Sequence, residues 1–149
     1  GRQRAWDECP RGDWMLWIGG KLSGEPGSPA RRLLVRCAVA CARTVLDKIP
    51  SEARAEIASV LDALDAYALD PTAQADLTAL RRRAWAVRSK CAAAAAAATD
   101  AAADAAAADA ADAAAYAAAN AANAADATRQ AHLARCAQLV RELMPQPPG

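Results

Sequence analysis

The chain has 149 residues and a formal net charge of +1, which fits one domain and leaves no overall field to recruit nucleic acid or an anionic membrane. It contains no Phe and only 4% aromatic residues, so its core must be built from Leu, Val, Ile, Trp and close alanine contacts. Strand-forming residues are too scattered to make a sheet. We therefore expect a single all-α domain over residues 1–149, a compact bundle of five to six helices with long, closely packed alanine-rich helices.

No segment resembles a signal peptide or a membrane span. The longest apolar run, residues 91–128, carries five aspartates, and each would be costly at the centre of a bilayer. Five cysteines is an odd number without a short regular framework, which favours reduced thiols over a disulfide scaffold. We expect a cytoplasmic protein that does not bind membranes.

The first twelve residues show no helix signal and are expected to form a loose lead, as are residues 145–149. Asp13 offers an N-cap for a short helix with the sequence DWMLWIGGKL, which should stop near Gly19 and Gly20. Trp14 and Trp17 lie three residues apart and therefore on one face of this helix.

With Trp6, the tryptophans at 14 and 17 are the largest apolar groups near the start of the chain. We interpret them as a lid of large side chains over a bundle whose other helices carry small ones. Stacking on a cofactor or binding a partner is the alternative role for this pair.

Residues 23–29 form a Gly/Pro/Ser loop, and Pro29 suits the first turn of a helix that runs to about Lys48 and stops at Pro50. Its apolar stripe consists of Leu33, Leu34, Cys37, Ala38, Cys41, Val45 and Ile49, and the residues largely off that stripe are Arg31, Arg32, Arg36, Arg43 and Lys48. Ser51 then caps a further helix that ends at Asp70 and Pro71. Its expected buried residues are Ile57, Val60, Leu61, Leu64 and Tyr67.

Residues 72–144 contain neither Gly nor Pro. One helix of that length would extend about 110 Å, whereas a domain of this size is only about 40 Å across, so the stretch must turn at least once or twice. We expect helices over about 71–98, 101–119 and 127–144. Alanine makes up 27 of residues 91–128, and its high helix propensity supports helices there.

Charge is distributed in blocks that suggest two surfaces for binding a protein partner. The acidic surface is one half of the alanine-rich helix and consists of Asp100, Asp104, Asp109 and Asp112. The basic surface consists of Arg81, Arg82, Arg83 and Arg88. Pairing of such blocks within the fold, or simple solvation, is the alternative.

Cys37 with Cys41 and His132 with Cys136 are both spaced i, i+4. If their helices faced each other, four ligands of Cys3His type would meet a tetrahedral zinc. Cysteine is also a common small core residue, and we favour that interpretation. We expect neither a resident metal nor another cofactor.

The chain has one histidine, no serine in a nucleophile elbow, and neither a GxGxxG nor a Walker pattern. We therefore expect no enzyme. A structural helical scaffold or oligomerisation module is one alternative. A less favoured one is an antifreeze-like ice-binding protein, suggested by Asp and Asn at eleven-residue spacing but lacking the threonine repeat.

Four segments together resemble a known family. They are WDECPRGDWMLWIGGKL near the start, RLLVRCAVACAR, the alanine run with Tyr116, and HLARCAQLVRELMP near the end. This combination resembles the alanine-rich immunity proteins of bacterial polymorphic toxin systems. The opening motif is matched by Arg11, Asp13, Trp14 and Trp17.

The resemblance implies a non-enzymatic protein that neutralises a cognate toxin by binding it. In that setting the acidic surface would imitate a phosphate backbone before a basic nuclease cleft. The sequence leaves the toxin and the oligomeric state open.

Overall fold

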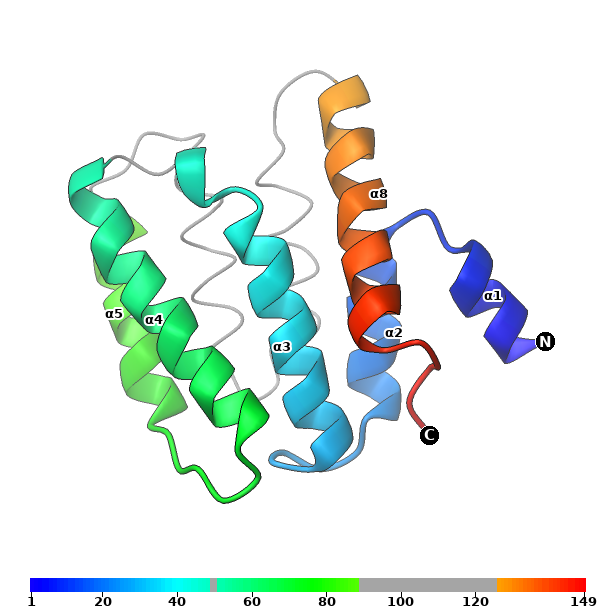
Figure 1. Cartoon of the computed structure of the whole chain (residues 1–149), viewed down its shortest axis with the longest axis horizontal. Coiled ribbons are helices and arrows are strands. Elements are labelled where there is room, and N and C mark those ends of the chain that lie inside the picture. Colours follow the sequence, from blue (N-terminus) through cyan, green and yellow to red (C-terminus); the bar gives the residue numbers. More distant parts are fainter. Residues whose placement is uncertain (49–50, 89–125) are drawn as a thin grey trace.

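The computed structural model describes residues 1–48, 51–88 and 126–149, and every regular element in these ranges is a helix (Figure 1). The expected all-α class is therefore confirmed. In chain order the elements are α1 (Arg2–Glu8), α2 (Gly12–Leu22), α3 (Pro29–Arg43), the 3-10 helix η1 (Leu46–Lys48), α4 (Ser51–Leu69), α5 (Leu77–Arg88) and α8 (Asp126–Leu143). None of these described helices is both long enough and apolar enough to cross a bilayer.

The helices pack side by side around one core (Figure 1). Helix α4 packs between α5 and α3, α8 packs on the other side of α3, and α2 lies against both α8 and α3. Helix α1 is the outermost element at that end. The largest fully buried side chains are Met15, Leu16, Leu34, Ile57, Leu61, Leu64, Val39, Val60, Val140 and Cys37.

Helix α3 begins as its sequence predicts. Ser28 is the N-cap, its Oγ accepts a hydrogen bond from the Arg31 N–H at 3.2 Å, and Pro29 occupies the first turn. The helix ends at Arg43, earlier than expected, and η1 follows after a turn. The expected buried residues are confirmed for Leu34, Cys37, Ala38, Cys41 and Val45 in this segment and for Ile57, Val60, Leu61 and Leu64 in α4.

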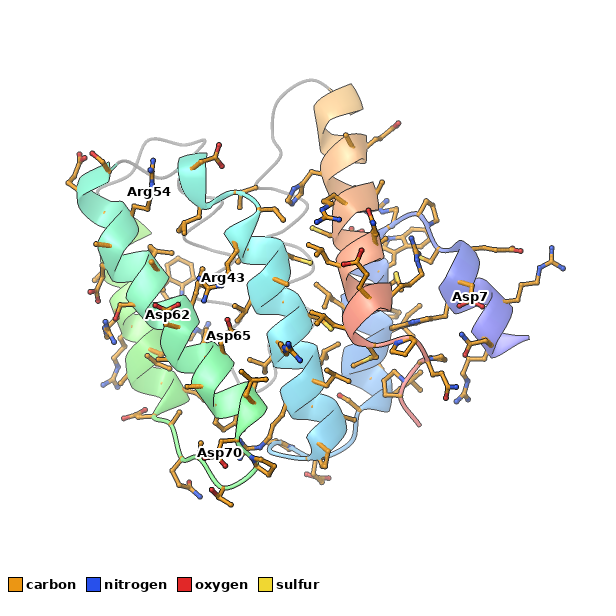
Figure 2. All side chains as sticks on the ribbon, in the orientation of Figure 1. Asp7, Arg43, Arg54, Asp62, Asp65 and Asp70 are labelled. Atoms are coloured by element: carbon orange, nitrogen blue, oxygen red, sulfur yellow. The ribbon has the colours of Figure 1, made fainter. Side chains whose placement is uncertain are left out.

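Charged side chains join α3 to α4 at the surface. Figure 2 shows Arg43 of α3 directed at Asp62 and Asp65 of α4, and its Nη2 lies 2.7 Å and 2.9 Å from their carboxylate oxygens. Partial burial opposes the charge of Arg43, but the hydrogen bonds to the two carboxylates outweigh it and raise the arginine's pKa. These pairs help to set the orientation of the two helices.

Arg32 was expected off the buried stripe, but it is only 9% exposed. Its guanidinium donates to four backbone carbonyls, namely Gly27 at 3.1 Å, Asp70 at 2.9 Å, Ala73 at 3.2 Å and, from Nη1, Tyr67. It also lies 4.1 Å from the centre of the Tyr67 ring. One arginine therefore ties the loop before α3 to the turn between α4 and α5, and burial is tolerated because its donors are satisfied.

The expected helix over residues 71–98 begins later than predicted. Asp70 accepts from the Thr72 hydroxyl and N–H at 2.7 Å and 2.9 Å, which lowers its pKa and forms a local turn in place of helix. Asp76 accepts from the Ala79 N–H at 2.9 Å, so α5 starts only at Leu77. The far end of that expected helix and the whole of 101–119 lie outside the described residues. Helix α8 starts and ends within one residue of its prediction.

The two chain ends, expected to be loose, are held against each other. Helix α1 forms within the first twelve residues, and Trp6 is 3% exposed with its indole N–H donating to the Met144 carbonyl at 3.0 Å. The Gln3 side chain donates to the Pro145 carbonyl at 3.0 Å. A seven-residue helix is too short for the sequence to show a clear helical period, so no pattern predicted α1. Burial of Trp6, its one buried side chain, is what stabilises the helix in the fold.

Candidate partner-binding surface

Helix α2 is held very close to α8 at its first residue, Gly12. A Cβ added there would lie 2.4 Å from the Cys136 Cβ and 2.6 Å from the Ala137 backbone nitrogen. Only glycine permits this approach of two backbones. The start of α2 is therefore locked in position on α8.

A partly buried ion pair holds the residues around that start. Asp13 is 6% exposed, and both of its carboxylate oxygens pair with the Arg11 guanidinium, with Nε to Oδ1 at 3.0 Å. The hydrogen bond to Asp13 raises the pKa of Arg11. The same guanidinium lies over the Trp14 ring, 4.7 Å from its centre. From α8, Arg141 donates to the Cys9 carbonyl at 2.7 Å, which secures the segment leading into α2.

The two faces of α2 differ sharply in side-chain size and burial. The inner face is buried and consists of Gly12, Met15, Leu16, Gly19 and Gly20. The outer face carries Trp14, Trp17 and Ile18, which are 55%, 49% and 37% exposed. The interpretation of Trp14 and Trp17 as a lid over the core is therefore wrong. Helix α2 also continues through Gly19 and Gly20 to Leu22, so the glycine pair does not end the helix as expected. Gly19 instead faces α3, where an added Cβ would lie 2.7 Å from the Leu34 Cδ1.

Cations lie at both ends of this outer face. Arg11 contacts Trp14, and Lys21 Nζ lies 5.9 Å from the centre of the Trp17 ring. We call the set Arg11, Trp14, Trp17, Ile18 and Lys21 the α2 stripe. Its residues recur at three and four residue spacings and so lie along one side of the helix.

The α2 stripe concentrates the exposed apolar surface of the described residues. Three of their four exposed large hydrophobic side chains lie on it, and the fourth, Leu69, is at the end of α4. If a tryptophan offers about 250 Å² for burial, Trp14 and Trp17 expose about 140 and about 120 Å². With Ile18 the patch reaches the size that is often functional on a monomer.

The basic surface predicted from the sequence is divided in the structure. Arg81 and Arg82 are exposed. Arg83 instead joins α5 to α4, with Nε 2.7 Å from the Glu56 carboxylate and Nη2 3.0 Å from the Ser59 hydroxyl. The hydrogen bond between Arg83 and Glu56 lowers the pKa of Glu56 and raises that of Arg83. Because both side chains are exposed, the pair contributes little to stability. The side chain of Arg88 and the acidic surface, Asp100, Asp104, Asp109 and Asp112, lie outside the described residues.

Three of the four proposed zinc ligands come close together, but not as a metal site. Cys136 Sγ lies 3.5 Å from His132 Nε2, and Cys41 Sγ lies 3.9 Å from the Cys136 carbonyl. His132 Nδ1 is 3.4 Å from the Thr44 hydroxyl. Cys37, Cys41 and Cys136 are buried free thiols. Within the described ranges, no three His, Cys, Asp or Glu residues are placed to hold a metal ion.

The three buried thiols differ in the direction of their pKa shifts. A hydrogen bond from Cys41, and next one from His132, lowers the pKa of Cys136 to about 6 despite burial. The Cys41 pKa is raised by the same hydrogen bond and by burial, and burial raises that of Cys37 to about 12. Because Cys136 is fully buried in the core, its sulfur offers no open site to a substrate.

Comparison of the chain with protein-family models, curated proteins and solved structures gives no match. Candidate surfaces must therefore be compared by their geometry. The α2 stripe combines large apolar area, two cations and a rigid attachment to the core, whereas Arg81 and Arg82 offer charge alone. Sequence reasoning placed Trp14 and Trp17 correctly on one face but chose the wrong side. Gly12 and Gly19, seven residues apart on the opposite face, were the pattern that would have corrected this prediction.

Proposed function

We propose that this chain is an immunity protein, which neutralises a cognate bacterial toxin by binding to it and performs no catalysis. The observation that carries the proposal is the exposure of Trp14 and Trp17 on a helix that is itself firmly packed. Tryptophan is enriched among residues that dominate binding energy in protein interfaces. In the isolated molecule, the exposed parts of these indole rings contribute nothing to the core.

The frame beneath these tryptophans suits inhibition by occlusion. Gly12 holds the start of α2 on α8, and the pair of Arg11 with Asp13 fixes the chain just before it. A surface that is already ordered loses little conformational entropy when a partner binds. The opening motif thus has two roles. Asp13 helps to fix the start of α2, and Trp14 and Trp17 are exposed to contact the partner.

The family resemblance supports the same proposal. Arg11, Asp13, Trp14 and Trp17 are the residues that match the opening motif of alanine-rich immunity proteins. We propose the cytoplasm as the place of action, where Cys37, Cys41 and Cys136 would stay reduced.

Co-expression tests this function directly. The chain is expressed with the toxin encoded beside its gene, and growth should be restored. Failure of rescue despite good expression of folded chain would overturn the proposal.

A titration with purified proteins tests the non-catalytic mechanism. Toxin activity should fall linearly and reach its minimum near one equivalent of chain. Loss of activity at a small fraction of an equivalent would instead indicate catalytic inactivation and would contradict inhibition by occlusion.

A further inference from the structure

The thiols of Cys41 and Cys136 lie next to each other where α3 packs on α8. The Cys41 thiol is hydrogen-bonded to the Cys136 sulfur, and its Sγ also lies 3.9 Å from the Cys136 carbonyl oxygen. Both side chains are free thiols, 1% and 0% exposed. Two cysteines held this close can be joined without unfolding either helix, and toxin binding makes no use of them.

We propose that Cys41 and Cys136 form a redox modification site, in which a hydroperoxide converts the two thiols into a disulfide that ties α3 to α8. Cys136 reacts first with the peroxide, and Cys41 completes the bond. Disulfides in cytoplasmic proteins are usually transient and sense redox conditions. The pair would thus stay reduced until peroxide appears, whether or not a toxin is bound.

Cys136 is the sulfur equipped to react first, because its surroundings favour the thiolate. Cys41 from α3 hydrogen-bonds to it, and His132 of α8 places Nε2 3.5 Å from its Sγ. These contacts lower the pKa of Cys136 to about 6 against burial and the negative charge of Asp13 on α2. The thiolate is the nucleophilic form of cysteine. Because the pKa of Cys41 is raised, Cys41 still carries its proton when Cys136 reacts.

The route from solvent to Cys136 passes His132. This histidine is half-buried, and its Nδ1 lies 3.4 Å from the hydroxyl of Thr44, an exposed residue. One imidazole ring therefore lies between a surface hydroxyl and the buried sulfur. A bulky substrate is excluded, but hydrogen peroxide has only two heavy atoms and needs only a turn of the His132 side chain. Restricted access makes the oxidation slow.

The oxidation balances in two steps. The Cys136 thiolate attacks one peroxide oxygen, so that an S–O bond forms and the O–O bond breaks, and the released hydroxide takes a proton from solvent. The Cys41 sulfur then attacks the sulfenic acid of Cys136, the S–S bond forms, and the hydroxyl leaves as water with the Cys41 proton. Each sulfur loses one electron, and the two peroxide oxygens gain both.

Cys37 is the competing partner for Cys41, but helix geometry disfavours it. The two residues stand four apart on α3, which places their Cβ atoms about 5 to 6 Å apart, whereas a disulfide needs about 3.5 to 4.5 Å. Burial also raises the pKa of Cys37 to about 12, so it remains a thiol. Cys37 is therefore a matched control for Cys41.

Peptide mapping of the folded chain tests the pairing. The reduced protein is treated with hydrogen peroxide, the remaining thiols are alkylated after denaturation, and tryptic peptides are identified by mass spectrometry. We expect peptide 37–43 to be linked to peptide 136–141, with Cys37 alkylated, and a dithiol reductant should reverse the link. Any other partner for Cys41 or Cys136, or recovery of both in alkylated form, would overturn the inference.

Two serine variants separate the roles of the thiols. Cys41→Ser keeps a hydrogen-bond donor beside Cys136 but cannot form the disulfide, so dimedone should label the sulfenic acid of Cys136 at least about fivefold more than in the wild type. Cys37→Ser should form the disulfide as the wild type does. Circular dichroism checks the folding of both variants. If Cys41→Ser does not fold, Cys136→Ala should leave Cys41 open to alkylation after peroxide treatment. A disulfide lost in Cys37→Ser, or Cys41 oxidised in Cys136→Ala, would contradict the assigned pair.

Thermal unfolding tests the effect on the fold. The disulfide joins residues 95 positions apart and so restricts a long loop of the unfolded chain. The Tm of the oxidised wild type should rise by about 5 to 10 °C, and peroxide should give no such rise in Cys41→Ser. An unchanged or lowered Tm in protein that contains the disulfide would show that it does not lock α3 on α8. Toxin neutralisation is judged separately by rescue in co-expression.

Discussion

Gly12→Ala should destabilise the protein more than its single added methyl group suggests. The new Cβ would lie 2.4 Å from the Cys136 Cβ, 2.6 Å from the Ala137 nitrogen and 2.7 Å from the Cys136 carbonyl carbon. Carbon atoms in contact normally stand about 3.5 to 4.0 Å apart. The obstacle includes backbone atoms of α8, which cannot rotate away, so α2 and α8 must separate by roughly 1 Å.

The magnitude follows from overpacking. Added methyl groups in tight cores cost about 1 to 3 kcal/mol, and contact with backbone places this one near the upper end, at about 2 to 3 kcal/mol. For a chain of this length that corresponds to a fall in Tm of roughly 5 to 10 °C. Urea unfolding followed by circular dichroism measures it, with an unchanged m-value showing that the unfolding transition itself is the same.

Gly19→Ala is the matched control, because Gly19 is also buried on the inner face of α2. Its added Cβ would meet the Leu34 Cδ1 at 2.7 Å, and this is the end of a flexible side chain. Alanine also gains up to about 1 kcal/mol over glycine inside a helix, so the net change should be small. If Gly12→Ala is as stable as the wild type, or if Gly19→Ala is the more damaging change, the locking of α2 on α8 is refuted.

Three further outcomes are expected. Arg32→Met should cost about 2 to 4 kcal/mol in urea unfolding, because four carbonyl partners lose a charged donor, while Arg36→Met on the same helix should cost much less. Arg83→Gln should change stability by less than about 0.5 kcal/mol, and a larger loss would contradict the view that its exposed pair is weak. The Cys136 pKa of about 6 lies below the usual thiol value of about 8.5, so the unfolded chain holds a proton that the folded chain has released between these pH values. The contribution of Cys136 to stability, taken as the difference between the wild type and Cys136→Ala, should therefore rise from pH 6 to 8.5 and be lost as pH falls towards 6. A thiolate absorbance that appears only above pH 8 would contradict the lowered pKa.

The sequence predicted the parts of the fold that depend on periodic burial. The buried residues of α3 and α4 recur at three and four residue spacings, and proline and serine mark where these helices begin or stop. Arg32 was missed because its acceptors come from Gly27, Tyr67, Asp70 and Ala73, which only the tertiary fold brings together. No local pattern reveals such a contact. Helix α1 was missed for the same reason, since its one buried side chain finds its partner at the far end of the chain.

The candidate site shows a different limit of sequence reasoning. Trp14 and Trp17 are the kind of residue that usually fills a core, and their common face was predicted correctly. Which side of the helix turns inward depends on the space that the neighbouring helices leave. Gly12 and Gly19 set that space, because a larger residue at either position would meet α8 or α3.

The glycines and the tryptophans of α2 are therefore two halves of one arrangement. Turning the helix by half a turn would place Trp14 and Trp17 on the inner side of α2, where they would collide with the backbone of α8 near Gly12 and with the Leu34 side chain of α3 near Gly19. The inner face thus excludes the tryptophans from the core, and their exposure follows from the packing of the chain itself. A partner that covers Trp14 and Trp17 would need no rearrangement of α2, since the frame already holds them outward.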